Sequence, residues 1–551
     1  MSRDRFNMSR RGFLARLGTS VAAGSLAACG DDDTGAGTDP SSSGTGLDLE
    51  RNPPPPAPAI EPPFALGVAS GDPLHDRVVI WTRLAPAPLE SDWGMPAEDV
   101  PVIWEVFADE ALTEPVRSGW TRARPALAHA VHVDVDGLRS DTPYWYRFRV
   151  GDDHVSPVGR TRTFPRPDAS PRAFRFAMAC CQKYRSGFYT AYHHLAREED
   201  LHAVFHLGDY IYESGGEPEV PGRLPLDRER VTDLAGFRHR YGAYRLDEDL
   251  QEAHRVHPWI ATWDDHEVSN NYGSLTLAPN RRGDGDPAAI RAAGYQAWYE
   301  HMPVRMPFPD DPTFLRIYRD FHFGTLARIF VLDSRQYRTP QACDDEVGPA
   351  CDEIFDPERT MLGHEQKAWL VDGLRHSDSR WNIMAQQVLF GPFNLDYSIV
   401  NPDQWDGYVH ARQQILDVLA EPDVHNPVVL SGDVHAAGFS VLRADAEDDR
   451  SPVIGHEILT TSISSGGDEL DGIARFAPLA EVALDNVDYV EAGKRGYALC
   501  ELTRNRLDVR FRVVTTVAAP TADVYVDRAY RIWAEQLTFE RRRDWEDEPP
   551  G

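Results

Sequence analysis

The chain has 551 residues, more than one hydrophobic core usually organises, so we expect two or more domains. Acidic residues outnumber basic residues by 87 to 57, which argues against binding to duplex nucleic acid, because such proteins need a cationic surface. An acidic protein can still act on an anionic substrate where bound cations reverse the local field.

Residues 1–29 have the pattern of an export signal. Arg10 and Arg11 form a twin-arginine start, and the apolar run after them, only about 15 residues long, is too short for a membrane helix. The run ends at Cys29 in a sequence that resembles a lipoprotein processing box. We predict export by the twin-arginine route to the periplasm, the cell surface or the exterior, with a membrane tether through a lipidated Cys29. The alternative is a twin-arginine signal with an incidental cysteine.

Residues 30–62 are rich first in Asp, Gly and Ser and then in Pro, which predicts a disordered tether that is stiffer at its end. Residues 63–167 contain strand-like runs at 77–83, 101–107, 130–136 and 144–150, separated by turn residues. This pattern predicts a β-sandwich resembling immunoglobulin or fibronectin type III domains. It contains no cluster of metal-ligand residue types, so we interpret it as a domain for packing and presentation.

Residues 172–535 alternate strand-like and helix-like runs and form the predicted second domain. Helices are expected at 190–199, 234–244, 289–302 and 364–374, and strands at 174–178, 203–207, 259–263, 327–332, 381–385, 427–430 and 456–462. Residues 497–502 and 507–514 predict an antiparallel hairpin. Residues 536–551 are a C-terminal tail, and the amphipathic segment 525–545 is expected to pack on the surface or, as a minority of such tails do, to act as a lid.

Four of these strand-like runs end in residue types that bind metals. They lead into Cys180-Cys181-Gln182, Gly208-Asp209-Tyr210-Ile211-Tyr212, Asp264-Asp265-His266-Glu267 and Ser431-Gly432-Asp433-Val434-His435. We therefore predict one polynuclear metal site at the carboxyl rim of a sheet.

The residue types indicate the chemistry of that site. Asp209 can bridge two cations, and the phenolate of Tyr212 suits a hard trivalent ion such as iron(III); the alternative is an N-cap aspartate beside a core tyrosine. Asp433 and His435 are two residues apart, so both can face the site on an extended backbone. His266 can stabilise an oxyanion or protonate a leaving oxygen.

The remaining cysteines and one histidine have simpler interpretations. Cys343 and Cys351 flank a short acidic loop and could form a disulfide in an oxidising compartment. Cys500 is expected to be a buried thiol, and His206 a core histidine. Cys180 and Cys181 point to opposite faces if both lie on a strand, so only one of them can readily face the site.

Taken together, the Cys-Gln strand end, Gly-Asp-Tyr-Ile-Tyr-Glu, Trp-Asp-Asp-His-Glu followed by Asn-Asn, and Ser-Gly-Asp-Val-His make the sequence resemble the alkaline phosphatase D family. That family is a branch of the calcineurin-like metallophosphoesterases and includes enzymes described as phospholipase D. The resemblance covers nearly the whole chain after the tether. It implies that the second domain is a metallophosphatase double β-sandwich flanked by helices, with Fe(3+) and Ca(2+) in its site.

The resemblance also implies roles for single residues. Iron would be held by Cys181, Asp209, Tyr212 and His435, with Asp209 bridging to calcium held by Asp265 and Asp433. His266 would be the acid or charge-stabilising residue. Cys180 stays open as an alternative thiolate, and Asp264, Asn270 and Gln386 (or its neighbour Gln387) are weaker metal candidates. Arg335 is a candidate phosphate clamp, the alternative being a structural salt bridge to Asp333 or a neighbour.

The leading hypothesis is a secreted alkaline phosphomonoesterase that releases phosphate from organic esters by attack of a metal-bound hydroxide. A phosphodiesterase of the phospholipase D type would share every metal ligand. A hypothesis of another class is a non-catalytic, surface-binding lipoprotein with structural metals. We expect a monomer whose partner is its phosphate ester substrate.

Overall fold

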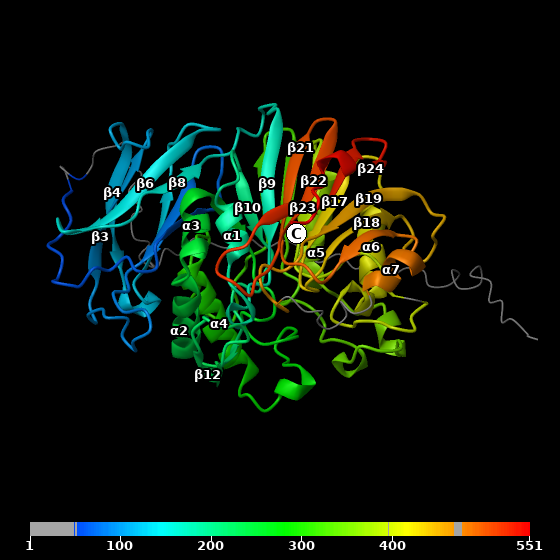
Figure 1. Cartoon of the computed structure of the whole chain (residues 1–551), viewed down its shortest axis with the longest axis horizontal. Coiled ribbons are helices and arrows are strands. Elements are labelled where there is room, and N and C mark those ends of the chain that lie inside the picture. Colours follow the sequence, from blue (N-terminus) through cyan, green and yellow to red (C-terminus); the bar gives the residue numbers. More distant parts are fainter. Residues whose placement is uncertain (1–48, 50–51, 395, 468–476, 551) are drawn as a thin grey trace, which may run out of the picture. The chain divides into compact units, whose positions relative to one another are not determined.

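The computed structural model describes residues 49, 52–394, 396–467 and 477–550 (Figure 1). The predicted export signal, the lipidation site Cys29 and most of the tether lie outside the described residues. None of the helices in the described part has the length and apolar character needed to span a membrane.

The largest sheet in the described part has ten strands, which come from segments between residues 68 and 541. Its strand order is β24 (Phe539–Arg541), β23 (Val524–Trp533), β22 (Arg506–Val514), β21 (Gly496–Thr503), β9 (Ala173–Ala179), β10 (Ala203–His206), β13 (Pro258–Ala261), β1 (Val68–Gly71), β2 (Val78–Arg83) and β5 (Ala130–Val135). The central strands β9, β10 and β13 are parallel to one another. The predicted hairpin of β21 and β22 is confirmed.

A seven-stranded sheet packs against the ten-stranded sheet. Its order is β14 (Arg319–Phe323), β15 (Ala327–Val331), β16 (Trp381–Ala385), β17 (Pro427–Ser431), β19 (Val453–Leu459), β18 (Ala437–Arg443) and β20 (Val487–Glu491). One hydrophobic core contains Phe176 and Phe205 from the first sheet and Ile329 and Val428 from the second. The two sheets therefore lie face to face.

Helices cover the outer faces of both sheets. Side chains alternate between the two faces of a strand, so the neighbours of the residues in the shared core point outward, toward these helices. Ala177 and Val204, the neighbours of Phe176 and Phe205, pack in a core with α1 (Thr190–Leu195), α2 (Leu234–Arg245), α3 (Glu248–Val256) and α4 (Pro287–His301). Val429 packs in another core with α5 (Gly363–Arg375) and α6 (Val409–Leu419). A short helix, α7 (Ala477–Ala483), precedes β20.

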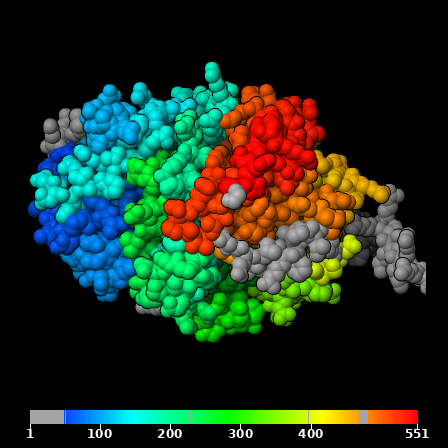
Figure 2. All heavy atoms as spheres, viewed as in Figure 1, coloured from blue at the N-terminus to red at the C-terminus, as the bar shows by residue number. Residues whose placement is uncertain are grey.

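The N-terminal strands form a further layer. A five-stranded sheet of β4 (Pro115–Ala123), β3 (Val100–Phe107), β6 (Pro143–Val150), β7 (His154–Val155) and β8 (Gly159–Arg162) packs on β1, β2 and β5 through a shared core. β1 also pairs in parallel with β13, so one layer of this sandwich continues the ten-stranded sheet. Figures 1 and 2 show the N-terminal segment in blue and the C-terminal strands in orange to red.

Local sequence explains where three helices begin, and one predicted surface segment contains a strand. Asp233, Asp247 and Asp286 cap α2, α3 and α4 by accepting hydrogen bonds from backbone N–H groups of the first turn. The amphipathic segment that begins at residue 525 is strand β23 over its first part, paired with β22. The register of that pairing shifts between Phe511 and Arg512, and the strand's burial does not alternate regularly.

A remaining two-stranded sheet joins β11 (Ser214–Gly216) and β12 (Leu226–Arg230).

Candidate active site

The four strand ends predicted to carry metal ligands converge, but from two sheets. β9, β10 and β13 are neighbours in the ten-stranded sheet, whereas β17 belongs to the seven-stranded sheet. The prediction of a rim on a single sheet was wrong in this respect. A strand's sequence reports its burial and its end, but it does not report which of two facing sheets the strand joins.

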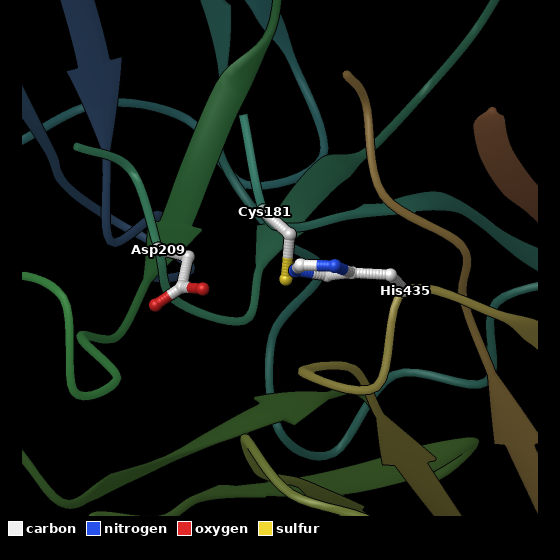
Figure 3. Close-up of side chains that lie close together, drawn as sticks. All are labelled: Cys181, Asp209 and His435. Carbon is white, nitrogen blue, oxygen red and sulfur yellow. The ribbon is translucent and has the colours of Figure 1, made fainter. Parts of the chain in front are cut away.

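The first group of side chains comprises Cys181, Asp209 and His435 (Figure 3). One potential ligand atom from each lies within 4.8 Å of the others. The hydroxyl of Tyr212 lies 2.8 Å from Asp209 Oδ2 and 3.1 Å from His435 Nε2, and it accepts a hydrogen bond of 2.7 Å from Ser465 Oγ. The structure thus brings together the four residues expected to hold iron.

Two further groups continue from the first. Asp209, Asp265 and His266 form the second group, and Asp264, Asp265 and Asp433 form the third. Asp209 is shared by the first two groups and Asp265 by the last two. The three groups are therefore linked through two carboxylates, as expected for adjacent cation positions that share bridging ligands.

The charge of this cluster fits bound cations. Asp264 Oδ2 and Asp265 Oδ1 are buried and accept no hydrogen bond within the described residues. Burial, together with neighbouring carboxylates and against the opposing charge of His266, raises the pKa of Asp209 well above its ordinary value. Burial and the charge of Asp264 likewise raise the pKa of Asp433 well above its ordinary value. Buried carboxylates without partners are costly unless a cation compensates them.

The ligand-type residues lie in strained backbone. Cys181, Asp209, Asp433 and His435 have φ angles of 56°, 57°, 68° and 56°, in the left-handed region that residues other than glycine rarely adopt. Gly208, at φ 114°, must be glycine, because a Cβ there would lie 2.3 Å from the Cβ of Asp264. Such conformations persist only where their surroundings fix them, and they cluster at functional sites.

Glu267 is one residue that fixes these loops. Its carboxylate accepts hydrogen bonds from the backbone N–H groups of Asp209 at 3.2 Å, Tyr210 at 2.5 Å and Asp264 at 2.8 Å. It therefore ties the loop after β10 to the loop after β13. Its place in the Trp-Asp-Asp-His-Glu motif was the one sequence signal for this role, which was not predicted.

His266 is held by a carboxylate that the sequence analysis also missed. Its Nδ1 lies 2.6 Å from Oε2 of Glu213, and the rings of His266 and Tyr212 are 4.0 Å apart. Burial alone would lower the pKa of His266, but the charges of Glu213, Asp265 and Asp209 outweigh it and raise that pKa well above its ordinary value. These carboxylates therefore favour the protonated form of the imidazole.

Arg335 is completely buried. Three carboxylates hydrogen-bond to its guanidinium, and Asp265 Oδ2 lies 3.9 Å from Nη2. Nε donates to Asp264, Nη1 to Asp403 at 2.6 Å and Nη2 to Asp433 at 3.2 Å. The side chain thus bridges the loops that carry Asp264 and Asp433, as in the salt-bridge alternative to a phosphate clamp. Asp333 contributes only by accepting the backbone N–H of Arg335 at 3.0 Å.

The weaker candidates divide between the site and its surroundings. Asp264 belongs to the third group. Asn270 donates its backbone N–H to Glu213, at 3.1 Å. Cys180 Sγ lies 3.8 Å from the carbonyl oxygen of Thr460 and 3.7 Å from that of Thr461, and it does not belong to any of the three groups.

Gln386 is engaged within the protein. It donates to Ser431 Oγ at 2.8 Å and accepts from the indole of Trp405 at 3.2 Å.

Asp403 and Gln404 complete the support of the cluster. Gln404 Nε2 donates to Asp433 Oδ2 at 2.6 Å, and Asp403 accepts from both Arg335 and Arg338. Both residues lie between β16 and α6, in a stretch without strand periodicity, so no sequence pattern pointed to them.

These strand ends and ligand groups form a candidate metal site of the kind that a metal-dependent hydrolase needs. The PhoD-like phosphatase family model matches residues 176–511, and the model of the PhoD-like phosphatase N-terminal domain matches residues 50–165. The chain belongs to the PhoD-like phosphatase family, and it is a phosphoric ester hydrolase.

Two relatives agree with this assignment. The chain is 44% identical over 478 residues to alkaline phosphatase D of Bacillus subtilis (strain 168), an alignment that covers 84% of this chain and 79% of the relative. A solved structure described as "Structure of PhoD" superposes with a TM-score of 0.82 at 41% identity, covering 88% of this chain and 93% of the other.

Proposed function

We propose that the chain is an alkaline phosphomonoesterase that uses iron(III) and calcium to release phosphate from organic esters. The observation that supports this most strongly is the set of three linked ligand groups, with Asp209 and Asp265 in shared positions beside His266. A phosphoryl group has several oxygens that carry negative charge, and adjacent cations can contact more than one of them.

The donor types support the choice of metals. Cys181, Tyr212 and His435 with Asp209 offer sulfur, phenol oxygen, imidazole nitrogen and carboxylate oxygen, a set that suits iron. Asp264, Asp265 and Asp433 offer oxygen alone, which suits calcium. Cations bound there would neutralise phosphoryl oxygens and lower the pKa of water.

The chain's own residues have three tasks in this proposal. His266, oriented by Glu213, holds a proton that it can give to the leaving oxygen or use to stabilise charge on the phosphoryl group. Arg335 braces the carboxylates and does not contact substrate, since Asp264, Asp403 and Asp433 surround it. Glu267 keeps the two ligand-bearing loops in register.

The wider organisation is part of the proposal. Residues 63–167 would form an immunoglobulin-like or fibronectin-like domain, 172–535 the metallophosphatase domain and 536–551 the tail. The twin-arginine pattern and Cys29 support export and lipid anchoring. We also propose that the enzyme acts as a monomer.

Hydrolysis of three substrates under one condition tests the activity. We expect metal-loaded protein at alkaline pH to release phosphate from a simple monoester faster than it cleaves a diester or a phospholipid. The measurement is kcat/KM for each compound on the same preparation. A strong diester or phospholipid preference would replace the monoesterase assignment with a phosphodiesterase of the phospholipase D type, and failure to cleave any of them would favour a non-catalytic binding protein.

The metals can be identified from colour and elemental content. Bonds from the Tyr212 phenolate or the Cys181 thiolate to iron(III) should give visible charge-transfer absorption. We expect this band together with iron and calcium in elemental analysis of the same sample, and we expect the band to be lost on removal of iron by a chelator. A colourless, active protein that contains only calcium would contradict the iron assignment.

A further inference from the structure

A small loop closed by a disulfide lies beside the carboxylate cluster. Cys343 and Cys351 are bonded, as the sequence predicted. Cys343, Asp344 and Asp345 have φ angles of 55°, 54° and 62°, so three successive residues other than glycine are left-handed. A backbone in this conformation needs an external constraint, and the disulfide at its first residue is one.

Asp345 connects this loop to the site. Both of its carboxylate oxygens accept a hydrogen bond from Nδ2 of Asn271, each at 2.9 Å. Asn271 in turn donates its backbone N–H to Asp265 Oδ2 at 2.6 Å. A continuous path therefore runs from the disulfide through Asp345 and Asn271 to Asp265, which is shared by two of the three ligand groups.

The chemistry of Asp345 makes this path directional. Burial and the charge of Asp403 raise the pKa of Asp345 to about 7, so at alkaline pH its carboxyl is ionised and only accepts hydrogen bonds. It then fixes the amide of Asn271 with its NH₂ toward Asp345 and its oxygen turned away. The backbone carbonyl of Asn271 accepts a hydrogen bond from Gln341 Nε2 at 2.8 Å. The backbone of Asn271 is itself left-handed, at φ 54°. The N–H that orients Asp265 thus belongs to a residue anchored from two sides.

We propose that Asp345 is a positioning residue for the cation bound by Asp264, Asp265 and Asp433, and that the Cys343–Cys351 disulfide holds Asp345 in place. This inference rests on the proposed function, because it deepens the description of the same site. Asp345 acts through Asn271 and does not touch substrate. Loss of either the carboxylate or the disulfide lets Asp265 leave the orientation that binds the cation.

Four variants test the path. Asp345→Ala removes both acceptor oxygens, whereas Asp345→Asn removes the same charge but keeps one acceptor. Cys343→Ser/Cys351→Ser removes the disulfide and opens the loop, but it changes no carboxylate residue. Asp344→Asn is the matched control, because Asp344 is the exposed neighbour in the same strained loop and has the same charge.

The readout is calcium binding by the full-length, iron-loaded protein. Calcium alone is titrated by calorimetry and by its effect on the melting temperature, and the visible iron absorption is recorded throughout. We expect calcium affinity about 10-fold weaker in Asp345→Ala and in the double serine variant, since residues that orient metal ligands typically contribute 10- to 100-fold. Asp345→Asn should lie between these variants and wild type, Asp344→Asn should match wild type, and the iron absorption should be the same in all.

The outcomes separate the inference from the function on which it rests. If wild type binds calcium and the Asp345 variants bind it equally well, the inference is overturned and the proposed function stands. If the double serine variant binds calcium as tightly as wild type while Asp345→Ala binds it more weakly, the part assigned to the disulfide is overturned. If wild type itself binds no calcium, both are overturned. A general destabilisation would lower the melting temperature without calcium and leave the calcium midpoint unchanged, which would also contradict the inference.

Discussion

Asp209→Asn should lower kcat/KM for phosphate esters by at least ~100-fold, because a neutral amide replaces the one carboxylate shared by the first two ligand groups. The same change should not destabilise the metal-free fold. Burial raises the pKa of Asp209, which means that the fold disfavours its ionised form, and asparagine is uncharged at every pH. Steady-state kinetics and metal-free thermal unfolding of the two proteins measure both effects.

A control and a contrary result sharpen this test. Asp344→Asn removes one negative charge from an exposed position and should leave kcat/KM unchanged. Asp209→Asn protein that retains its fold and hydrolyses esters at the parental rate would refute the assigned site. A loss of activity together with a large loss of metal-free stability would indicate a structural role for Asp209 instead.

Arg335→Met should destabilise the metal-free protein by about 3–5 kcal/mol, the range seen when one partner of a buried ion pair is removed. Methionine keeps much of the length but leaves Asp264, Asp403 and Asp433 without the cation that they share. Arg335→Lys should recover only part of the loss, because an ammonium cannot direct separate planar donors at three carboxylates. Urea unfolding monitored by fluorescence gives the free energies.

The matched control is Arg375→Met. Arg375 pairs with Glu421 on the surface, with 51% of its side chain exposed, and solvent screens that pair, so its loss should change stability little. An Arg335→Met protein no less stable than this control would show that the buried network contributes nothing to the fold. Added metal should partly restore the Arg335 variants, because bound cations would compensate the same carboxylates.

Local pattern was sufficient to predict most of the elements and the ligand-type residues. The runs before Cys181, Asp209 and Asp265 are short and almost wholly apolar, as expected for strands buried on both faces. Each ends in polar residues that could only lie at a rim. Strand position and chemical type therefore located the four segments, and the resemblance to a known family singled out residues within them. Seven of these residues, with Asp264 among the weaker candidates, form the three groups, and Tyr212 contacts the first group.

What the sequence could not show depends on contacts between distant segments. Asp403 lies in an irregular stretch, and only its meeting with Arg335 reveals its role. The membership of β17 in a second sheet likewise depends on long-range packing. The left-handed backbone at Cys181 follows from the loop around it, since cysteine by itself does not favour that conformation.

The position of β1 next to β13 limits the order in which the polypeptide can fold during synthesis. β1 is made early, but Ser70 pairs with Pro258, and in the later strand β9 residues Ala173–Met178 pair with residues 498–503. Contacts of such high sequence separation form slowly. The β9 edge that pairs with β21 therefore stays unpaired until the ribosome has made residues 498–503, and an unpaired strand edge favours aggregation.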